Sequence, residues 1–332
     1  MSGGGLGAGE RADPDGVDER PHADAALEQL RPDAFAVAYR MLGSVADAED
    51  IVQEALLRLH SARERGERIA SPRAYLATVT TRLAIDQLRS ARARRESYVG
   101  DWLPEPLVGG DAAPLSHGSL PDDPARRAEL SDSLSCAFLV LLERLTPEER
   151  AALLLHDVFD YGYGEVGQVI GKSEANARQL ASRARRHVTA GRPRFEGSEE
   201  RRRELGERFF EAIENGDMEA LEALLARDVV LRGDGGGKVP ALARALHGAE
   251  RVGRTLGAWF RSGLRGDART ERGEINGRPG VLLRAADGGV IGTMSLEIAD
   301  DRVVGIYAVV NPDKLAHLGT VGDMRAMLRG GR

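Results

Sequence analysis

Residues 146–188 read TPEERAALLLHDVFDYGYGEVGQVIGKSEANARQLASRARRHV, and this stretch decides the fold class. It opens with a capping box that carries proline in its first helical turn, formed by Thr146, Pro147 and Glu149. Gly171 predicts the end of a short helix, because glycine readily adopts the left-handed conformation that ends helices. Ser173 predicts the N-cap of the next helix. We therefore expect helices at residues 151–158, 163–170 and 174–188, in a helical unit that spans residues 126–190.

The last of these helices has two chemically different faces. Apolar residues recur on one face at helical spacing: Ala177, Leu180, Ala184 and Val188. The same period turns polar and basic side chains to the opposite face: Arg178, Gln179, Ser182 and Arg186. Arginine and glutamine can pair with guanine and adenine edges in the major groove, and serine and arginine can contact phosphates. The pattern predicts the recognition helix of a helix-turn-helix, with a plain helical hairpin of basic, solvated face as the alternative.

A second helical pattern lies towards the N-terminus. Apolar residues twice follow the i, i+3, i+4, i+7 spacing: Phe35, Ala38, Tyr39 and Leu42, then Val52, Ala55, Leu56 and Leu59. Ser71 and Pro72 predict the start of a helix that runs to about residue 95. These signals predict one all-helical domain at residues 28–97. One face of its last helix sets an aromatic ring among charged groups, which suits single-stranded DNA: Tyr75, Arg82, Asp86 and Arg89.

Charge is unevenly distributed along the chain. The formal net charge is −6, which by itself argues against a nucleic-acid partner. Residues 82–95 nevertheless carry five arginines and one aspartate, and residues 172–194 carry one lysine, six arginines and one glutamate. Two compact basic segments on an acidic chain favour two surfaces that contact phosphates, with merely solvated helix faces as the alternative.

The segments between and around these units have a different composition. Residues 98–125 contain five prolines with several glycines and aspartates, which predicts a linker, since neither a helix nor a central strand tolerates them. Residues 1–27 are rich in glycine, alanine and aspartate and predict a disordered leader. Residues 316–332 are expected to form a C-terminal tail.

Beyond residue 197 the pattern changes from helices alone to helices followed by strands. Helices are expected at 201–215, 218–226 and 249–263. Residues 280–311 then read GVLLRAADGGVIGTMSLEIADDRVVGIYAVVN, which predicts three strands joined by turns at 287–289 and 300–301. This order predicts a small α+β domain with an antiparallel meander at residues 200–315.

Several classes of protein are excluded or disfavoured. No apolar run approaches the roughly 20 residues of a membrane-spanning helix, and the N-terminal sequence lacks the order of a secretory signal, so we expect a cytoplasmic protein. Cys136 is the only cysteine, which excludes an intrachain disulfide; we expect a small buried apolar side chain, with a redox switch as the alternative. HExxH, CxxC and phosphate-binding glycine motifs are lacking, so no metal or cofactor is expected.

Three stretches resemble the two conserved domains of the extracytoplasmic-function sigma factors of the sigma-70 family. They are AYRMLGSVADAEDIVQEALLRLH at 38–60, SPRAYLATVTTRLAIDQLRSARARRE at 71–96, and residues 145–188, which include the stretch quoted at the start. The resemblance covers about residues 28–190. It implies that the first domain binds core RNA polymerase through Asp50, Gln53 and Glu54. It also implies that this domain contacts the minus-ten promoter element through Tyr75, Arg82, Asp86 and Arg89. The second domain would read the minus-thirty-five element through Arg178, Gln179, Ser182, Arg183 and Arg186.

Three further motifs resemble one subgroup of that family, the sigma factor J type with a C-terminal SnoaL-like domain of the NTF2-like cone fold: WLPEP at 102–106, DGGGK at 234–238 and NPDKL at 311–315. The resemblance implies a multidomain fold of two all-α sigma domains and a C-terminal α+β cone. It also implies that the cone regulates the sigma factor from within. The regulatory contacts would be Trp102, Pro104, Glu105, Pro106, Asp234, Lys238, Asn311, Asp313 and Lys314.

The linker is expected to dock on the C-terminal domain. Trp102 is a large apolar residue in a proline-rich segment that has no core of its own, so it should pack against another surface. The chain has only three lysines, and two of them, Lys238 and Lys314, fall in the C-terminal motifs. We expect these two lysines to meet Glu105 or acidic groups of the sigma domains.

An enzyme remains the alternative for the cone, because cones of this fold also serve as isomerases, hydrolases and ligand pockets. Asp234 and His247 could then act as base and acid, although an aspartate in a glycine-rich turn more often caps the backbone. We expect a regulatory domain rather than an enzyme. The expected partners are core RNA polymerase and promoter DNA, with a small ligand of the cone left open, and the chain is expected to be monomeric.

Overall fold

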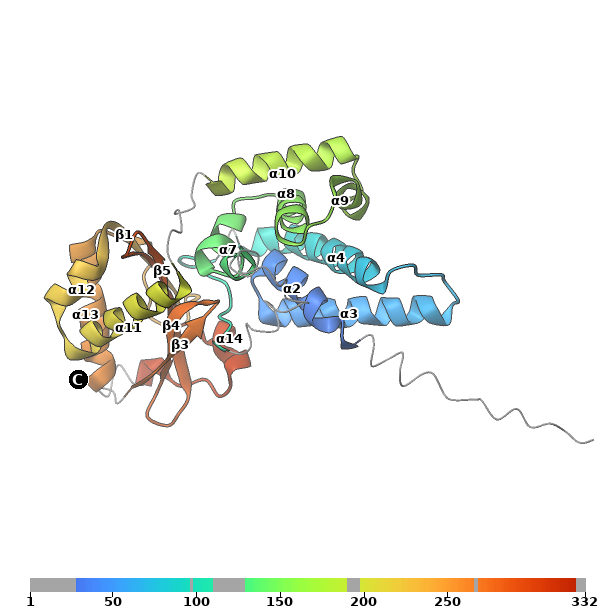
Figure 1. The fold of residues 1–332 in the computed structure, drawn as a ribbon. Coiled ribbons are helices and arrows are strands. Elements are labelled where there is room, and N and C mark those ends of the chain that lie inside the picture. The colour runs from blue at the N-terminus through green and yellow to red at the C-terminus, as the bar shows by residue number, and fades with distance from the viewer. Residues whose placement is uncertain (1–27, 96–97, 110–128, 190–197, 266–267, 327–332) are drawn as a thin grey trace, which may run out of the picture.

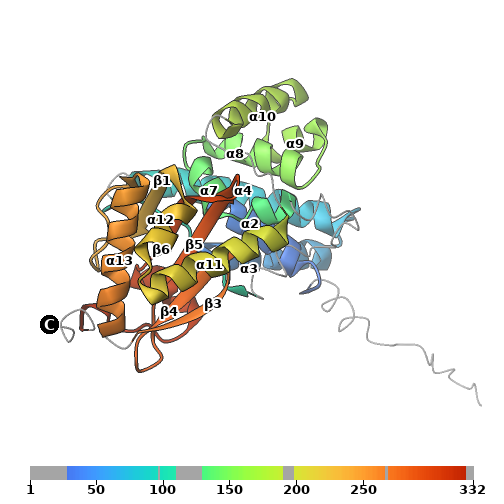
Figure 2. The same cartoon turned by 60° about the vertical axis from the view of Figure 1, so that its left-hand side comes forward.

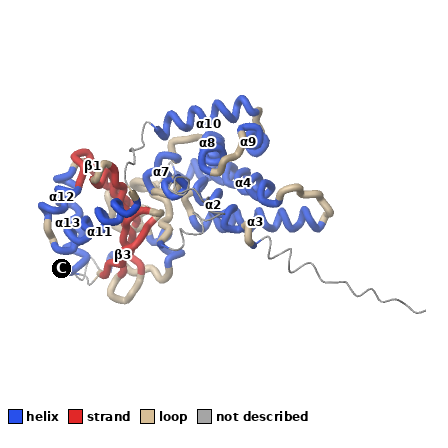
Figure 3. The backbone as a smooth tube through the Cα atoms, viewed as in Figure 1, coloured by secondary structure: helices blue, strands red, loops and turns tan. Residues whose placement is uncertain are grey.

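The computed structural model describes residues 28–95, 98–109, 129–189, 198–265 and 268–326. The leader expected at 1–27, most of the linker from 110 onwards and the end of the tail at 327–332 lie outside these ranges. Figure 1 shows two helical units on one side of the molecule and a domain built on a β-sheet on the other. Figure 3 shows that all strands belong to this C-terminal domain.

Among the described residues, the first helical unit consists of α2 (Arg31–Leu42), α3 (Val45–Glu64) and α4 (Pro72–Arg95). The eight apolar residues predicted from the helical spacing are all buried. The Oγ atom of Ser71 accepts a hydrogen bond of 3.2 Å from the Ala74 amide, which confirms the predicted start of α4. Ser44 caps α3 in the same way through the Asp47 amide, also at 3.2 Å.

The second helical unit contains α7 (Cys136–Leu142), α8 (Pro147–Leu153), α9 (Tyr163–Ile170) and α10 (Glu174–Thr189). The capping box predicted at Thr146 and Glu149 is confirmed, as are the left-handed Gly171 at the end of α9 and the Ser173 cap of α10. The helix predicted at 151–158 differs in one respect. It begins at Pro147, and its last turn, Leu154–Val158, is π-helical.

The two helical units share one hydrophobic core. A single cluster of buried side chains joins α2, α3 and α4 to α7, α8 and α10, and it includes Leu42, Leu59, Leu88, Leu142 and Leu154. Helices α8 and α9 lie directly over α4 (Figure 1). The units are therefore packed as one body in this structure.

The C-terminal domain begins with helices α11 (Glu199–Asn215) and α12 (Met218–Leu224). The remaining elements are β1 (Leu225–Asp234), β2 (Leu246–His247), α13 (Ala249–Arg265), β3 (Arg269–Ile275), β4 (Arg278–Arg284), β5 (Val290–Ala299), β6 (Arg302–Val309), α14 (Pro312–Leu315) and the 3₁₀ turn η3 (Ala316–Leu318). They form one six-stranded sheet in the order β2-β1-β6-β5-β4-β3. The predicted meander of β4, β5 and β6 is confirmed, with its turns at 287–289 and 300–301.

Three strands were not predicted, so the expected order of helices first and strands afterwards is wrong. Strand β1 pairs in parallel with β6, whose residues lie 75 to 78 positions further along the chain, and this long-range pairing places residues 225–226 in a strand and not in the predicted helix. Strand β2 is only two residues long. Strand β3 reads RTERGEI, and its charged side chains lie exposed at the edge of the sheet, where apolar alternation is not required.

The two faces of the sheet are covered by different parts of the chain. Helices α11, α12 and α13 cover one face (Figure 2), and their apolar side chains form a core with β1, β4, β5 and β6. The opposite face packs against residues 98–109 and against the second helical unit, with Leu103 fully buried among Leu282, Val290, Val309 and Leu315. Within the described ranges, no helix combines the length and the apolar character needed to cross a membrane.

Candidate nucleic-acid and regulatory sites

The outward face of α10 is uncovered. The five residues expected to read duplex DNA are all exposed, and with Ala175 they line a shallow depression: Arg178, Gln179, Ser182, Arg183 and Arg186. The opposite face is packed, since Ala177, Ala184 and Val188 are buried and Leu180 is half-buried. The helical period of the sequence therefore places these side chains on one open surface.

The arginines of α10 differ in how firmly they are held. Arg178 pairs with Glu174 at 2.9 Å and both side chains are more than half exposed, so phosphate oxygens can replace the carboxylate at little cost. Arg185 instead lies at 2.5 Å from Asp157 and 3.0 Å from the Tyr163 hydroxyl. These hydrogen bonds raise the pKa of Arg185 above its ordinary value. Arg185 thus fixes α10 to the rest of its unit, whereas Arg178 and Arg186 lie exposed on its open face.

The expected minus-ten face of α4 is partly occupied by the second helical unit. Arg82 donates hydrogen bonds to the carbonyl oxygens of Val169 (2.9 Å) and Gln168 (2.8 Å), at the C-terminal end of α9. Arg89 lies 2.5 Å from Glu148, at the start of α8. Asp86 remains exposed and Tyr75 is half-buried. Two of the four residues expected to contact the minus-ten element therefore bond the second helical unit, and Asp86 pairs with Arg89 at 3.3 Å.

The expected polymerase-binding residues lie on an exposed edge of α3. Asp50, Gln53 and Glu54 are all exposed, and Glu54 pairs with Arg58 at 2.7 Å. Leu57 lies one turn from Gln53 and Glu54 with 56% of its surface exposed, the value of a large apolar side chain that lacks a packing partner within the described ranges. The helical spacing of the sequence already places Leu57 outside the apolar stripe of α3, so its exposure could have been predicted. The resemblance to the sigma factors gave no role to this residue.

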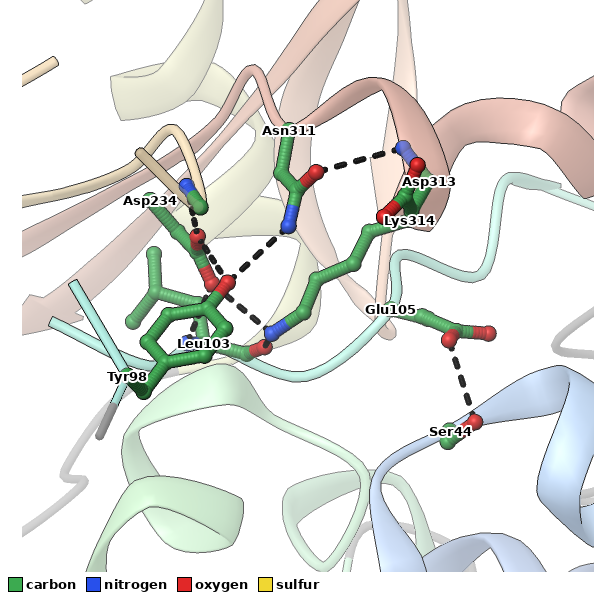
Figure 4. Close-up of polar contacts among 9 residues, drawn as sticks. Ser44, Tyr98, Leu103, Glu105, Asp234, Asn311, Asp313 and Lys314 are labelled. Atoms are coloured by element: carbon green, nitrogen blue, oxygen red, sulfur yellow. Dashed lines mark hydrogen bonds and ion pairs between the residues drawn. The ribbon is translucent and has the colours of Figure 1, made fainter. Parts of the chain in front are cut away.

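A buried carboxylate joins the linker to the C-terminal domain. Asp234, at the end of β1, is 0% exposed and accepts hydrogen bonds from the Tyr98 hydroxyl (2.6 Å) and the Leu103 amide (2.9 Å), as Figure 4 shows. The Lys314 ammonium lies 2.8 Å from the same carboxylate and also bonds the Leu103 carbonyl. Asn311 donates to the Tyr98 hydroxyl at 2.9 Å. We call these five residues the Asp234 cluster.

Charge and aromatic faces reinforce the Asp234 cluster. The Lys314 ammonium lies 4.3 Å from the centre of the Trp102 ring, and the Trp102 ring also packs against Gly43 of the first helical unit. Gly43 has a φ of +64°, and a Cβ atom there would lie 2.5 Å from the ring, so only glycine fits. Burial and the hydrogen bond to Asp234 raise the pKa of Tyr98, which keeps its hydroxyl protonated as a donor.

Glu105 connects the same linker to the first helical unit. Its carboxylate accepts a hydrogen bond of 2.6 Å from the Val45 amide at the N-terminus of α3. It also accepts one of 3.0 Å from the Ser44 hydroxyl, which Figure 4 shows. A negative charge at this end of a helix is favourable, because the first backbone amides lack partners within the helix. The Glu105 amide also donates to the Gly43 carbonyl at 2.8 Å.

The expected pairing of the two lysines with Glu105 or the sigma domains is wrong. Lys314 is drawn to the buried Asp234 of its own domain, and the exposed Lys238 pairs with Asp313 at 2.5 Å. Glu105 already has its donors at the start of α3, where backbone amides supply the positive end of a helix. Pro104 and Pro106 flank Glu105, and the carbonyl of Pro106 lies 2.8 Å from His317.

The C-terminal domain also contacts both helical units directly. The Asn276 amide group donates to the Tyr39 hydroxyl (2.6 Å) and to the Leu134 carbonyl (3.0 Å), and its oxygen accepts from the Leu107 amide. Arg278 is 1% exposed and joins Asp132 (2.7 Å) to Glu297 (3.0 Å). Burial raises the pKa of Glu297 in spite of the neighbouring guanidinium.

Asn276 and Arg278 are the functional candidates that the sequence analysis missed. Asn276 and Gly277 form the turn between β3 and β4, with φ of +54° and +68°. An Asn-Gly pair is a strong signal for a two-residue hairpin turn, so it could have predicted both the turn and strand β3. No local pattern predicts that Asn276 and Arg278 lie at an interface, because polar side chains in or beside a turn ordinarily face water.

Cys136 lies at this interface, with its sulfur 3.6 Å from the Ser295 hydroxyl of β5. It is 3% exposed, and burial raises the pKa of its thiol to about 12. Because the folded pKa is raised, the stability gained from a neutral buried thiol is present below the ordinary value near 9 and is lost as the pH rises towards 12.

We expect Cys136 to react with Ellman's reagent at pH 8 at least about 10³-fold more slowly in the folded chain than in urea, because the reagent reaches it only when the interface opens. Absorbance at 412 nm measures the rate. A matched chain with Cys136→Ala and Ser90→Cys carries its thiol on the exposed side of α4 and should react at nearly the unfolded rate. Fast reaction of Cys136 in the folded wild type would contradict the closed interface.

The alternative pair of catalytic residues is not assembled. Asp234 is fully buried and engaged by the donors described above, and its Oδ1 atom also accepts a hydrogen bond of 3.0 Å from the Gly236 amide, as expected for a backbone cap. His247 lies exposed on β2. Among the described residues, no group of three or more histidine, cysteine, aspartate or glutamate side chains could hold a metal ion.

Comparisons with known proteins agree with this arrangement. The Sigma-70 region 2 family matches residues 26–94, and the Sigma-70 region 4 family matches residues 137–188. The ECF RNA polymerase sigma factor SigJ of Mycobacterium tuberculosis is 41% identical over 298 residues, which cover 87% of this chain and 91% of that protein. The probable ECF RNA polymerase sigma factor SigI of the same species is 33% identical over 89% of this chain and 93% of its own length. The crystal structure of M. tuberculosis SigJ matches with a TM-score of 0.68 at 37% identity, over 88% of this chain and 98% of the other.

Proposed function

Because the chain belongs to the extracytoplasmic-function sigma factors of the sigma-70 family, RNA polymerase-binding proteins that recognise promoters, we propose that each of these tasks falls to its own helix. Helix α3 binds core RNA polymerase, α4 contacts the minus-ten element, and α10 reads the minus-thirty-five element. The C-terminal NTF2-like domain regulates them from within. The observation that carries this assignment is the open basic face of α10, opposite a face of buried and half-buried apolar side chains.

The closed packing of the helical units gives the regulation a physical basis. The longest helix of the shared core, α4, has 24 residues and is therefore about 36 Å long. Promoter elements named minus ten and minus thirty-five lie about 25 base pairs, or about 85 Å, apart. Two units that share one core are too compact to reach both, so we propose that they separate on promoters. The linker and the cone oppose this separation, because they form hydrogen bonds with both helical units.

The cone is proposed to be a regulatory domain rather than an enzyme. The suggested base, Asp234, is committed to the linker, and the suggested acid, His247, is exposed on β2. The relatives that match along most of the chain are named as sigma factors. We further propose that the chain acts as a monomer in the cytoplasm, where polymerase and chromosomal DNA are found.

Replacement of Arg178 and Arg186 by alanine should weaken binding to minus-thirty-five duplex DNA about 5- to 150-fold for each side chain that reads a base edge. A side chain that only touches phosphate would instead give a smaller loss and a shallower salt dependence. Fluorescence anisotropy over a range of salt concentrations distinguishes the two. Arg208→Ala with Arg254→Ala removes the same charge from exposed positions of the cone and should leave binding unchanged. Equal affinity and equal salt slope for both double variants would refute the role of α10.

Run-off transcription with purified core polymerase tests the whole proposal. The full chain should yield promoter-dependent transcripts, and a chain that ends at residue 197 should change their amount several-fold if the cone regulates. Circular dichroism of the truncated chain establishes that its helices remain folded. Turnover of small carbonyl compounds without any promoter-dependent transcript would favour the enzyme instead.

A further inference from the structure

A cavity of about 210 Å³ lies in the cone, on the face of the sheet that the helices cover. It is bounded by α13, by the end of β1 and the loop that follows it, by strands β3 to β6, and by the last described turn. None of the described residues that line it carries a charge. Its principal walls are aromatic and aliphatic: Trp259, Phe260, Leu283, Met294, Ala308 and Met324.

The size of the cavity limits what it can hold. An apolar cavity of about 150 Å³ accommodates benzene, and pockets for drug-sized molecules begin at about 300 Å³. A volume between these values fits a molecule of one or two rings. The Asp234 cluster and the interface with the helical units lie on the other face of the sheet, so the cavity is separate from the regulatory contacts described above.

The chemistry of the walls limits the ligand further. A charged group placed among these side chains would lose its hydration without gaining a partner, which is strongly unfavourable. Thr270 and Thr293 also line the cavity, and the hydroxyl of Thr270 donates its hydrogen bond to Glu214 at 2.9 Å, so only the lone pairs of that hydroxyl remain for a ligand. Ser262 lies at the exposed rim. The lining thus offers a few hydroxyl groups to a weakly polar group on an otherwise apolar molecule.

We propose that this cavity binds a small, uncharged aromatic molecule of one or two rings. Trp259 and Phe260 supply the aromatic surface, and rings favour offset or edge contacts with such side chains. Met294 and Met324 supply flexible walls that adapt to the shape of the occupant. The proposal goes beyond sigma activity and needs neither polymerase nor DNA to be tested.

The probe for the test is 1-aminonaphthalene, an uncharged two-ring fluorophore whose emission shifts to the blue in apolar surroundings. Titrated into the full chain, it should show saturable binding at one site. In a Trp102→Phe chain the only remaining tryptophan is Trp259, and its emission should be quenched along the same titration curve. Unlabelled naphthalene should displace the probe, whereas naphthalene-1-carboxylate, the same ring with a charge, should not.

Two variants reduce the space and one serves as a matched control. Ala308→Leu adds carbon atoms inside the cavity, and Ala241→Phe places a ring at its exposed mouth. Each should weaken binding of the probe about tenfold or more. Ala243→Phe adds the same ring to an exposed position of the same loop that does not line the cavity, and it should bind as the parent does. Thermal unfolding shows whether each variant keeps the parent fold.

Four results would overturn the proposal: no saturable binding by the full chain, equal displacement by the carboxylate, parental affinity in both cavity variants, or equal weakening by Ala243→Phe. The last would mean that the probe binds the outer surface of the loop.

Discussion

Charge reversal of Asp50 and Glu54 together will lower the affinity of the chain for core RNA polymerase by about 100-fold or more. The two carboxylates lie at i and i+4 on an exposed edge of α3, where they present one acidic surface to a basic partner. Reversal turns each attraction into a repulsion, and hot-spot residues of protein interfaces are worth about 2 kcal/mol or more apiece. The measurement is a titration of core polymerase against labelled Asp50→Arg/Glu54→Arg protein.

The matched control reverses two other exposed carboxylates near the same helix. Glu64 lies at its last residue and Glu67 just beyond it, so Glu64→Arg with Glu67→Arg makes the same change of net charge two turns or more away. This control should bind core polymerase as the wild type does. Leu57→Asp should weaken binding as well, because its exposed apolar side chain lies one turn from Glu54. If the Asp50/Glu54 variant binds normally with its helices intact, α3 does not form the polymerase contact.

Asp234→Asn will lower the free energy of unfolding by about 3–5 kcal/mol and will release the linker from the cone. The carboxylate and the Lys314 ammonium are a buried pair, and removal of one partner leaves the other charge without compensation. Thermal or urea unfolding measures the loss of stability. Reaction of Cys136 with Ellman's reagent under native conditions should accelerate in parallel, since its thiol lies in the interface that the linker helps to close.

Asp313→Asn is the appropriate comparison. It removes the partner of Lys238, a pair whose side chains are 63% and 54% exposed, so we expect at most about 1 kcal/mol. Promoter-dependent transcription by the two variants then shows whether the cluster regulates. Equal stability and equal transcription of Asp234→Asn and Asp313→Asn would mean that the Asp234 cluster neither holds the linker nor transmits regulation.

Local signals predicted most of the fold. Caps such as Ser71, Thr146 and Ser173, the left-handed Gly171 and the 3.6-residue stripe of α10 each act within one turn of helix, so the sequence alone reveals them. The same holds for the β4–β6 meander, whose strands are joined by short turns.

Long-range contacts account for what the sequence did not predict. Strand β1 forms because it pairs with β6, and no pattern within residues 225–234 predicts that pairing. The pairing of Lys314 was misassigned for a related reason. A buried carboxylate requires a charged or hydrogen-bonding partner, and burial of Asp234 depends on the packing of the linker, which no local pattern reveals. The packing of the two helical units into one core could not be predicted from local patterns either. The spacing of apolar residues shows which face of a helix is buried, but it does not show which other helix covers that face.

Four hydrogen-bond donors surround Asp234: Tyr98 and Leu103 of the linker, and Lys314 and Gly236 of the cone. A linker that leaves only in part takes donors away from Asp234 while the rest of the linker still keeps water from the carboxylate. A half-released linker is therefore less stable than either the bound or the fully departed one. Intermediate degrees of release are therefore sparsely populated, and each molecule holds its linker either fully or not at all. The ratio of the two forms changes tenfold for only about 1.4 kcal/mol.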